Sequence, residues 1–376
     1  MTATLQTTNG DARATVGPRT RAERSFRIAV FCYGLPCPGQ KRGGVDQAAH
    51  DLANALVDRG HEVVVHSYDD RPPDGRYAVR ILPFRTLATS WAGKRAMLGY
   101  FGNIVALCVD YRGFDVVLAH GDSLLLPLSR KPVIRIMHGS ALEEARSATS
   151  IGRRVLQSGV YLQELMTAWS QPTVGVSENT RVSNRFVRRV IPNGVDLSLF
   201  TPAGERTPHP SLVFVGALDG RKRGAWLIDQ FVSRVQPAFP TAELHMVTPA
   251  GPSAAGITYH TGIDRPALAR LYQRAWVYVS PSTYEGFGLP YLEALACGTP
   301  VVATPNPGSR EVLANGRYGQ LPADDDFAAT TCRLLSDAAL RDTLSRDGLA
   351  RAREFDIASA AEQYETLIAS MVARRA

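Results

Sequence analysis

Two glutamates with seven residues between them, Glu285 and Glu293, lie in the string YEGFGLPYLEALACGTPVV. The residues before this string alternate as in a strand, and those after Gly288 have helical spacing, with Pro290 suited to the first helical position and Gly298 to the end. We therefore predict a strand, a glycine loop and a short helix. The unpaired N–H groups and the dipole of such a helix N-terminus favour a phosphate or another anion.

The two carboxylates would repel that anion unless the ligand also carries hydroxyl groups, because a carboxylate accepts hydrogen bonds and cannot donate them. A nucleotide sugar meets both demands: amides bind its phosphates, and Glu293 accepts from a vicinal diol. Gly286 and Gly288 would let such a ligand approach the backbone closely. A buried strand and helix with two surface carboxylates is the alternative interpretation of the same residues.

The whole string resembles the signature of the retaining glycosyltransferases of family 4. The resemblance covers about residues 26–370 and is most specific between 277 and 312. It implies an α/β protein with the GT-B fold, in which two Rossmann-like domains face each other across a cleft. The second domain would bind the nucleotide sugar and the first the acceptor. Transfer would retain the anomeric configuration through a front-face path.

Other segments match further parts of this family. Gly43 and Gly44 open a helical pattern after the first strand, and the resemblance places Gly44 at the donor's phosphate and sugar. His138, followed by Gly139, ends the strand VIRIMH and would lie beside the transferred sugar, although a lone histidine there is often structural. The resemblance assigns catalytic roles to His138, Glu285 and Lys222. The residues assigned to the donor are Gly44, Arg221, Lys222, Arg223, Glu285, Gly286, Phe287, Gly288, Leu289 and Glu293.

The segment VGALDGRKRGAWLI departs from the family at one position. Lys222 matches the family's lysine at the diphosphate, but Ala217 occupies the place of the family's arginine. Arg221 or Arg223 would then supply the missing positive charge, or phosphate binding would be weaker. A solvated basic turn is the alternative. Lysine and arginine neutralise a departing diphosphate without a metal, so we expect neither a metal site nor a cofactor.

The chain divides into a tail, two domains and a last helix. Residues 1–24 lack periodicity and are predicted to be disordered. Strands that alternate with helical patterns indicate a first Rossmann-like domain at 25–200 and a second at 201–356. The linker IPNGVDLSLFTPAGERTPHP separates them, and its Asn193-Gly194 pair predicts a tight turn. Residues 357–376 have a helical pattern, and in this family the last helix crosses back to the first domain.

Composition excludes several classes of protein. The net charge of +7 is modest, and no motif for binding nucleic acid is present. The sequence has no secretory h-region and no apolar run long enough to span a membrane, so we expect a cytoplasmic protein.

Residues 91–111 predict a core helix of the first domain, with an acceptor border or a peripheral membrane contact as the alternative. Asp324 to Asp326 contain an Asp-x-Asp but open a helix, so capping explains them better than a metal.

The predicted reaction is transfer of a sugar from a nucleotide sugar to a hydroxyl of a small molecule, a glycan or a lipid. Two alternatives stay open. One is an NAD-dependent oxidoreductase, although the glycine loop lacks the third glycine and the acidic residue of the dinucleotide fingerprint. The other is a catalytically silent protein that binds a sugar nucleotide.

Overall fold

The computed structural model describes residues 24–37, 43–86, 102–121, 123–146 and 150–374. The N-terminal half forms a seven-stranded parallel sheet in the order β3-β2-β1-β4-β5-β6-β7. Its strands are β1 (Arg27–Phe31), β2 (Glu62–Ser67), β3 (Ala78–Ile81), β4 (Val116–Ala119), β5 (Val133–Met137), β6 (Thr173–Gly175) and β7 (Arg189–Val190). The strands β1, β4 and β5 are buried at nearly every position, as expected for a sheet covered on both faces.

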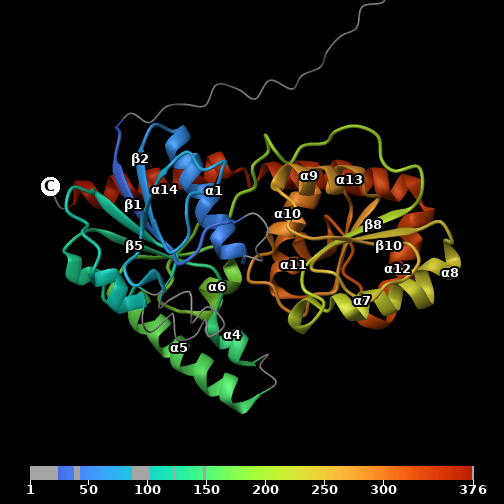
Figure 1. Ribbon diagram of the computed structural model, residues 1–376, viewed down its shortest axis with the longest axis horizontal. Helices are drawn as coiled ribbons and strands as arrows, with labels where there is room; N and C mark the ends of the chain where they lie inside the picture. Colours follow the sequence, from blue (N-terminus) through green and yellow to red (C-terminus); the bar gives the residue numbers. More distant parts are fainter. Residues whose placement is uncertain (1–23, 38–42, 87–101, 122, 147–149, 375–376) are drawn as a thin grey trace, which may run out of the picture.

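Helices and short helical turns connect these strands. They are α1 (Gly44–Asp58), η1 (Leu126–Ser129), α4 (Ala141–Arg146), α5 (Ile151–Ser170) and α6 (Glu178–Ser183). In Figure 1, α4 and α5 extend below the rest of this half of the molecule. The side chain of Ser150 caps α5 by accepting a hydrogen bond from the N–H of Arg153.

The C-terminal half forms a five-stranded parallel sheet in the order β10-β9-β8-β11-β12. Its strands are β8 (Ser211–Val215), β9 (Glu243–Val247), β10 (Ile257–His260), β11 (Val277–Ser280) and β12 (Val301–Ala303). The helical segments are η2 (Gly220–Lys222), α7 (Gly224–Gln230), η3 (Phe231–Val235), α8 (Gln236–Ala238), α9 (Arg265–Arg274), α10 (Leu289–Ala296), α11 (Pro307–Val312), η4 (Ala314–Gly316), α12 (Asp324–Ser336), α13 (Ala338–Arg353) and α14 (Ile357–Ala373).

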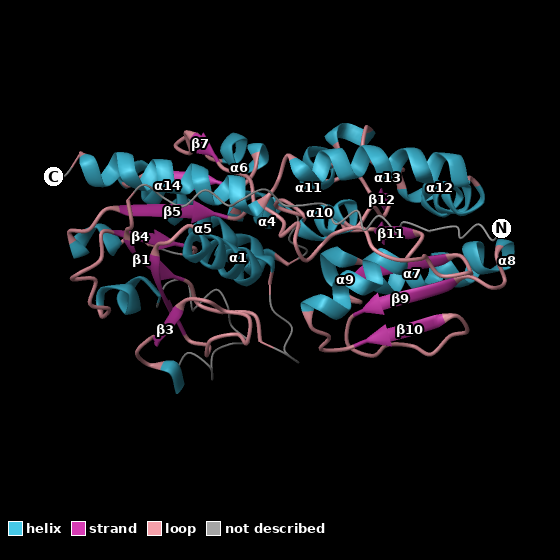
Figure 2. Ribbon diagram, turned by 90° about the horizontal axis from the view of Figure 1, so that it is seen from above, coloured by secondary structure: helices cyan, strands magenta, loops and turns pink. Residues whose placement is uncertain are grey.

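The two sheets share one topology and face each other. Each has its first strand at the centre and reverses strand order beside it, between β1 and β4 in one half and between β8 and β11 in the other. In Figure 2 the arrow of β5 and the arrows of β9 and β10 point toward the middle of the molecule from opposite sides. Open α/β sheets bind ligands at such reversal points, outside the carboxyl ends of their strands. Two ligand-binding edges therefore oppose each other.

The last helix, α14, packs against α1 of the first half (Figure 1). Its buried residues Ala361, Tyr364 and Ile368 belong to the same apolar cluster as Ala49 and Leu56 of α1. The side chain of Arg59, which follows α1, also donates a hydrogen bond of 2.5 Å to Glu365 of α14. The chain thus returns from the second sheet to the first.

One local prediction is wrong. Asn193 and Gly194 form no turn; residues 191–194 have no regular secondary structure, and the turn lies at 197–199. Gly194 is needed because a Cβ atom there would lie 2.3 Å from the Cα of Ile357, where the chain crosses back. The crossing is fastened by two backbone hydrogen bonds, from Val195 N–H to the Phe355 carbonyl oxygen and from Ile357 N–H to the Val195 carbonyl oxygen.

The predicted helix at 91–111 lies partly outside the described residues. Residues 102–107 are helical, and Val105 and Ala106 are fully buried. Ile104 and Leu107 are exposed. The described part of this segment therefore buries one side and exposes the other. Within the part of the chain that the structure describes, none of the helices is long and apolar enough to cross a membrane.

Candidate active site

The loops after β8 and β11 meet at the reversal point of the second sheet. The first loop carries Arg221 and Lys222, and the second carries Glu285. Lys222 Nζ lies 2.5 Å from Glu285 Oε1, and Arg221 Nη1 lies 2.7 Å from Glu285 Oε2. The backbone fastens the two loops together as well, because the N–H of Thr283 donates to the carbonyl oxygen of Arg221 at 2.9 Å. The three side chains form one rigid cluster with an excess of positive charge.

The cluster keeps Glu285 ionised although its side chain is only 8% exposed. Burial acts to raise the pKa of Glu285, but the charges of Lys222 and Arg221 outweigh it, and the pKa is lowered. A carboxylate offers about four lone-pair sites. With two of them used by the cations, Glu285 can still accept hydrogen bonds from a ligand's hydroxyl groups.

Arg223 faces away from this cluster. Its guanidinium forms a two-pronged pair with Asp324 at the start of α12, with N–O distances of 2.7 and 3.0 Å, and lies 4.3 Å from the centre of the Trp226 ring. Of the two arginines that could replace the one missing at Ala217, the structure brings only Arg221 to Glu285.

The aspartates 324–326 lie in the first turn of α12, whose N-cap residue is Ala323. Their carboxylates therefore complement the helix dipole, and the prediction that they cap the helix is wrong. Among the described residues, no group of three or more His, Cys, Asp or Glu side chains has a geometry that can hold a metal ion.

His138 lies where the two halves touch. The carbonyl oxygen of His138 would be 2.5 Å from a Cβ atom on Gly286, so the loop of Glu285 packs directly against the end of β5. The hydroxyl of Tyr284 would likewise be 3.5 Å from a Cβ atom on Gly139. The predicted residues His138 and Glu285 are thus brought together from strands of different sheets.

A second histidine, His120, holds the ring of His138. His120 Nδ1 and His138 Nε2 share a hydrogen bond of 2.9 Å, and the two rings stack with centroids 5.1 Å apart. Burial lowers the pKa of His138 to about 4, and burial together with His138 lowers that of His120. Both rings are therefore neutral near pH 7. His120 was not predicted from the sequence, although it directly follows β4 as His138 directly follows β5, and that shared position was the available signal.

The glycines of the loop are also needed for packing within the protein. Gly286 is needed for contact with the backbone of His138, and Gly288 has φ +98° with the Tyr291 ring 2.3 Å from the place of its Cβ atom. Both serve packing within the protein and the start of α10. Gly44, by contrast, has no atom of a described residue within 4 Å of the place of its Cβ atom. It is the predicted glycine whose surroundings leave room for a ligand.

Phe287 and Leu289 are buried in the core, so only their backbone groups are available for a donor. The ring of Phe287 packs against that of Phe355 with centroids 5.8 Å apart. Phe355 directly precedes the return of the chain to the first half.

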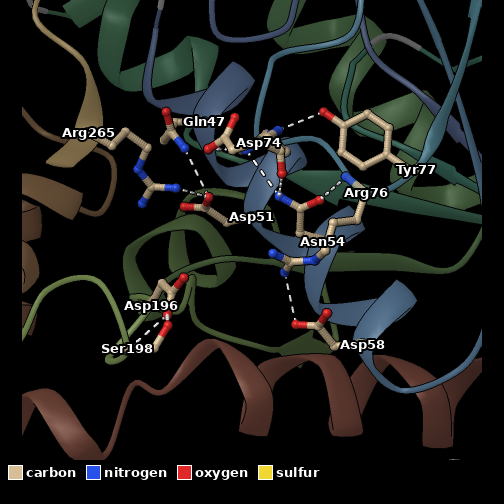
Figure 3. Close-up of polar contacts among 11 residues, drawn as sticks. Gln47, Asp51, Asn54, Asp58, Asp74, Arg76, Tyr77, Asp196, Ser198 and Arg265 are labelled. Atoms are coloured by element: carbon tan, nitrogen blue, oxygen red, sulfur yellow. Dashed lines mark hydrogen bonds and ion pairs between the residues drawn. The ribbon is translucent and has the colours of Figure 1, made fainter.

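Glu293, on α10, is buried and accepts a hydrogen bond of 3.1 Å from the hydroxyl of Tyr272. Burial raises its pKa to about 7, with Asp51 adding to the rise and the nearby charge of Arg265 opposing it. Arg265 at the start of α9 forms an ion pair with Asp51 of α1, and Figure 3 shows the two side chains meeting between the halves. The glutamate predicted to bind a ribose diol therefore lies beside an ion pair that links the two halves.

A network on α1 holds Asp51 in place. Gln47 donates to Asp51 at 2.9 Å, and one turn further on Asn54 accepts from the N–H of Arg76 at 2.8 Å (Figure 3). The hydroxyl of Tyr77 and the ring of the buried His50 share a hydrogen bond of 2.7 Å. No local pattern in the sequence connects Arg265 with Asp51, since 213 residues separate them.

We predict that Glu293 makes stability fall as the pH rises. Below pH 4.5 the carboxyl is protonated in both the folded and the unfolded chain, whereas between about pH 4.5 and 7 only the unfolded chain releases its proton. The free energy of unfolding should therefore fall over this range, by up to about 3 kcal/mol. Glu293→Gln should remove that part of the pH dependence in urea unfolding at pH 5 and pH 8. An unchanged difference between the two pH values would contradict the raised pKa.

Two family models match this chain. The one described as Glycosyltransferase Family 4 matches residues 42–199, and the one described as Glycosyl transferases group 1 matches residues 209–337. Together they include every strand of the two sheets except β1, and they contain all the candidate residues.

Curated relatives cover nearly the whole chain at low identity. The phosphatidyl-myo-inositol mannosyltransferase of Mycobacterium tuberculosis is 26% identical, over 92% of this chain and 98% of the relative. The D-inositol 3-phosphate glycosyltransferase of Corynebacterium jeikeium is 25% identical, over 92% of this chain and 96% of the relative.

Solved structures share the fold. The sucrose-phosphate synthase of Thermosynechococcus elongatus superposes with a TM-score of 0.73 at 21% identity, over 93% of this chain and all of that chain. HepE of Anabaena, solved with UDP and glucose, gives a TM-score of 0.68 at 17% identity, over 92% of this chain and all of that one. Both sheets, both family matches and these superpositions agree: the chain belongs to glycosyltransferase family 4, has the GT-B fold and is a glycosyltransferase.

Proposed function

We propose that the enzyme transfers a sugar from a nucleotide-diphosphate sugar to a hydroxyl acceptor with retention of anomeric configuration and without a divalent metal. One observation carries the proposal: Lys222 and Arg221 are both clamped to Glu285 at the reversal point of the second sheet, against His138 of the first. This arrangement offers positive charge to a diphosphate and a carboxylate to a sugar, side by side.

The proposed reaction is a front-face displacement. The acceptor oxygen bonds to the anomeric carbon on the side from which the diphosphate departs, as the bond from that carbon to the phosphate oxygen breaks. The proton of the acceptor hydroxyl passes to the departing phosphate. Lys222 and Arg221 stabilise the negative charge that grows on the phosphate, and Glu285 stabilises the positive charge at the anomeric carbon. His138, neutral near pH 7, contacts a sugar hydroxyl and is not assigned as a base.

Arg221 takes the role of the arginine that Ala217 replaces. Its guanidinium reaches Glu285 from the turn η2, and its Nη1 also donates to the carbonyl oxygen of Tyr284 at 2.5 Å. Two contacts to one loop fix the planar group at the diphosphate end of the cluster. Arg223 pairs with Asp324 and so stabilises the turn η2, and it does not bind the donor.

For the acceptor we propose a hydroxyl on a polyol or lipid headgroup. The relatives named above are a phosphatidyl-myo-inositol mannosyltransferase and a D-inositol 3-phosphate glycosyltransferase. Phosphatidylinositol and inositol phosphate are therefore the first acceptors to test, with glycans and small metabolites after them. A cytoplasmic location stays a prediction from the sequence.

The donor is identified first, by thermal shift of the purified protein with UDP, GDP, ADP and dTDP. A nucleotide at about 100 times its dissociation constant should stabilise the folded state by about 2.7 kcal/mol. The matching nucleotide sugar is then incubated with each acceptor, and the new linkage is assigned by NMR. The donor's own configuration in the product supports the proposal, and an inverted linkage rejects it.

The same reaction tests the metal. We expect the rate of transfer to be unchanged in EDTA, because Lys222 and Arg221 stand where a metal ion would otherwise balance the diphosphate. Complete loss in EDTA, restored by Mg²⁺ or Mn²⁺, would contradict this. Nucleotide binding without transfer or hydrolysis under any condition would favour the catalytically silent alternative.

A further inference from the structure

The ring of His138 has one nitrogen that a ligand can reach. Its Nε2 atom is hydrogen-bonded to His120 Nδ1 at 2.9 Å, so Nδ1 of His138 is the ring nitrogen that remains for the cleft. The two residues follow β4 and β5, which are neighbouring parallel strands, and their rings stack at the edge of the sheet. His138 is partly exposed, whereas His120 is buried. His120 therefore lies behind His138 and does not itself reach a ligand.

The position of the protons on this pair determines what His138 can do. The pair holds two ring protons, because both rings are neutral near pH 7. One proton lies in the shared hydrogen bond. If His120 Nδ1 donates that bond, the second proton is on His138 Nδ1. If His138 Nε2 donates it, the second proton is on His120 Nε2, and Nδ1 of His138 can only accept.

The surroundings of His120 Nε2 distinguish between these two arrangements. Within the part of the chain that the structure describes, this buried atom has no hydrogen-bond partner. The cavity beside His120 has a volume of about 10 Å³, at the lower limit for one water molecule, and much of its lining is apolar, with Ala48, Leu52 and Ile136. In protein backbones a buried N–H group without a partner is rarer than a buried acceptor without one, and the same preference applies to a buried imidazole. The proton of His120 therefore lies on Nδ1 and not on Nε2.

We propose that His120 is a positioning residue that fixes the proton of His138 on Nδ1, so that His138 donates a hydrogen bond to a hydroxyl oxygen of the transferred sugar. The contact with the sugar rests on the proposed function. The charges at the site favour the same tautomer. Glu285 is an ionised carboxylate, and the diphosphate of the donor would add further negative charge, so an N–H group faces these charges better than a lone pair does.

This tautomer complements Glu285. A sugar hydroxyl has one proton, which it can donate to Glu285 while its oxygen accepts from His138 Nδ1. The two groups come from adjoining segments, because a Cβ atom on Gly286 would lie 2.5 Å from the carbonyl oxygen of His138. The opposite tautomer would place two acceptors at one hydroxyl, which could satisfy only one of them. His120 thus sets the orientation of a hydroxyl that it does not touch.

Nitrogen-15 NMR of the full chain, labelled at histidine, tests the tautomer without any reaction. A ring nitrogen that carries a proton resonates well apart from a bare one, and the spectra of His138→Gln and His120→Asn assign the two rings. We expect His138 to be protonated at Nδ1 and bare at Nε2 near pH 7. A proton on Nε2 of His138 would overturn the proposal, whether or not the enzyme transfers a sugar.

Two substitutions of His120 carry the same question into the reaction. The amide nitrogen in His120→Asn takes about the place of Nδ1 and can donate to His138 Nε2, whereas the carboxylate in His120→Asp only accepts and draws the proton of His138 onto Nε2. The assay is run at about pH 8.5, so that His138 beside a carboxylate is neutral. His120→Asn should keep the donor kcat/KM near that of the wild type, and His120→Asp should lower it by about tenfold or more. An Asp variant at least as active as the Asn variant would overturn the proposal.

A second histidine pair provides the matched control. His245 Nδ1 is bonded to His260 Nε2 at 3.1 Å, through the same two atoms, but on the outer strands β9 and β10 rather than at the loops of β8 and β11. His245→Asn and His245→Asp should therefore leave kcat/KM unchanged. Thermal melting and the nucleotide thermal shift show that each variant is folded and binds nucleotide. If the wild type binds nucleotide but transfers no sugar, the proposed function fails, and the NMR spectrum of the wild type still decides the tautomer.

Discussion

Glu285→Gln is expected to lower kcat by about 10- to 150-fold while leaving the donor KM unchanged or lower. Loss of a charge-assisted hydrogen bond costs about 1.5 to 3 kcal/mol, and this bond strengthens as positive charge grows at the anomeric carbon. The variant also frees Lys222 and Arg221 from their carboxylate partner. Two unpaired cations should bind the diphosphate of the donor at least as well as before. The two constants are measured at saturating acceptor.

Glu293→Gln, on α10, provides the contrast. In the predicted role, its bond to a ribose diol would be made alike in ground and transition state, so this variant should mainly raise the donor KM, by a similar factor. Because the pKa of Glu293 is about 7, the wild-type donor KM should also fall as the pH rises from 6 to 8. Glu243→Gln on β9, a partly exposed carboxylate away from the site, is the control. If Glu293→Gln lowers only kcat and Glu285→Gln raises only KM, the two roles are exchanged.

Gly286→Ala is expected to lower kcat by about 100-fold or more. The new Cβ atom would lie 2.5 Å from the carbonyl oxygen of His138. Because that oxygen belongs to the backbone, no side-chain rotation can relieve the clash. The loop of Glu285 and the end of β5 must therefore move apart, and a displacement of about 1 Å at reacting groups costs about that factor. Measuring kcat for the variant tests the contact directly.

Nucleotide binding should survive in Gly286→Ala, because Arg221 and Lys222 lie on the second half alone, and the thermal shift with nucleotide checks this. Gly152→Ala on α5 is the matched control, since among the residues that the structure describes no atom lies within 4 Å of the place of its Cβ atom. A normal kcat for Gly286→Ala would show that the two halves do not work in this arrangement.

The sequence predicted the elements well where one kind of pattern dominated. Buried runs such as those of β1, β4 and β5 are unambiguous in a parallel sheet, and the strand predicted at VIRIMH is present as β5. The strand β7 was missed because two residues, Arg189 and Val190, carry no periodicity. The domain boundary near residue 200 stays a prediction, although it falls between β7 and β8.

The site was harder to predict because its parts come from distant segments. The string around Glu285 named the residues, but nothing local shows that Arg221 turns toward that glutamate and Arg223 toward Asp324. The same holds for the purpose of Gly286. A glycine in a loop suggests freedom for a ligand, whereas here the space is filled by the backbone of His138, 148 residues earlier. Such contacts depend on how the two halves meet.

The return of α14 to α1 has a consequence for the order in which the protein is made. A ribosome completes the first half of the chain early, and domains generally fold as they emerge, N-terminal first. Here Tyr364 and Ile368, near the end of the chain, complete the apolar cluster around α1. The domain that is synthesised first is therefore finished last. The surface of α1 that α14 covers therefore stays exposed while the whole second domain is translated. Ribosome-bound chains that lack α14 should be more sensitive to protease than released chains.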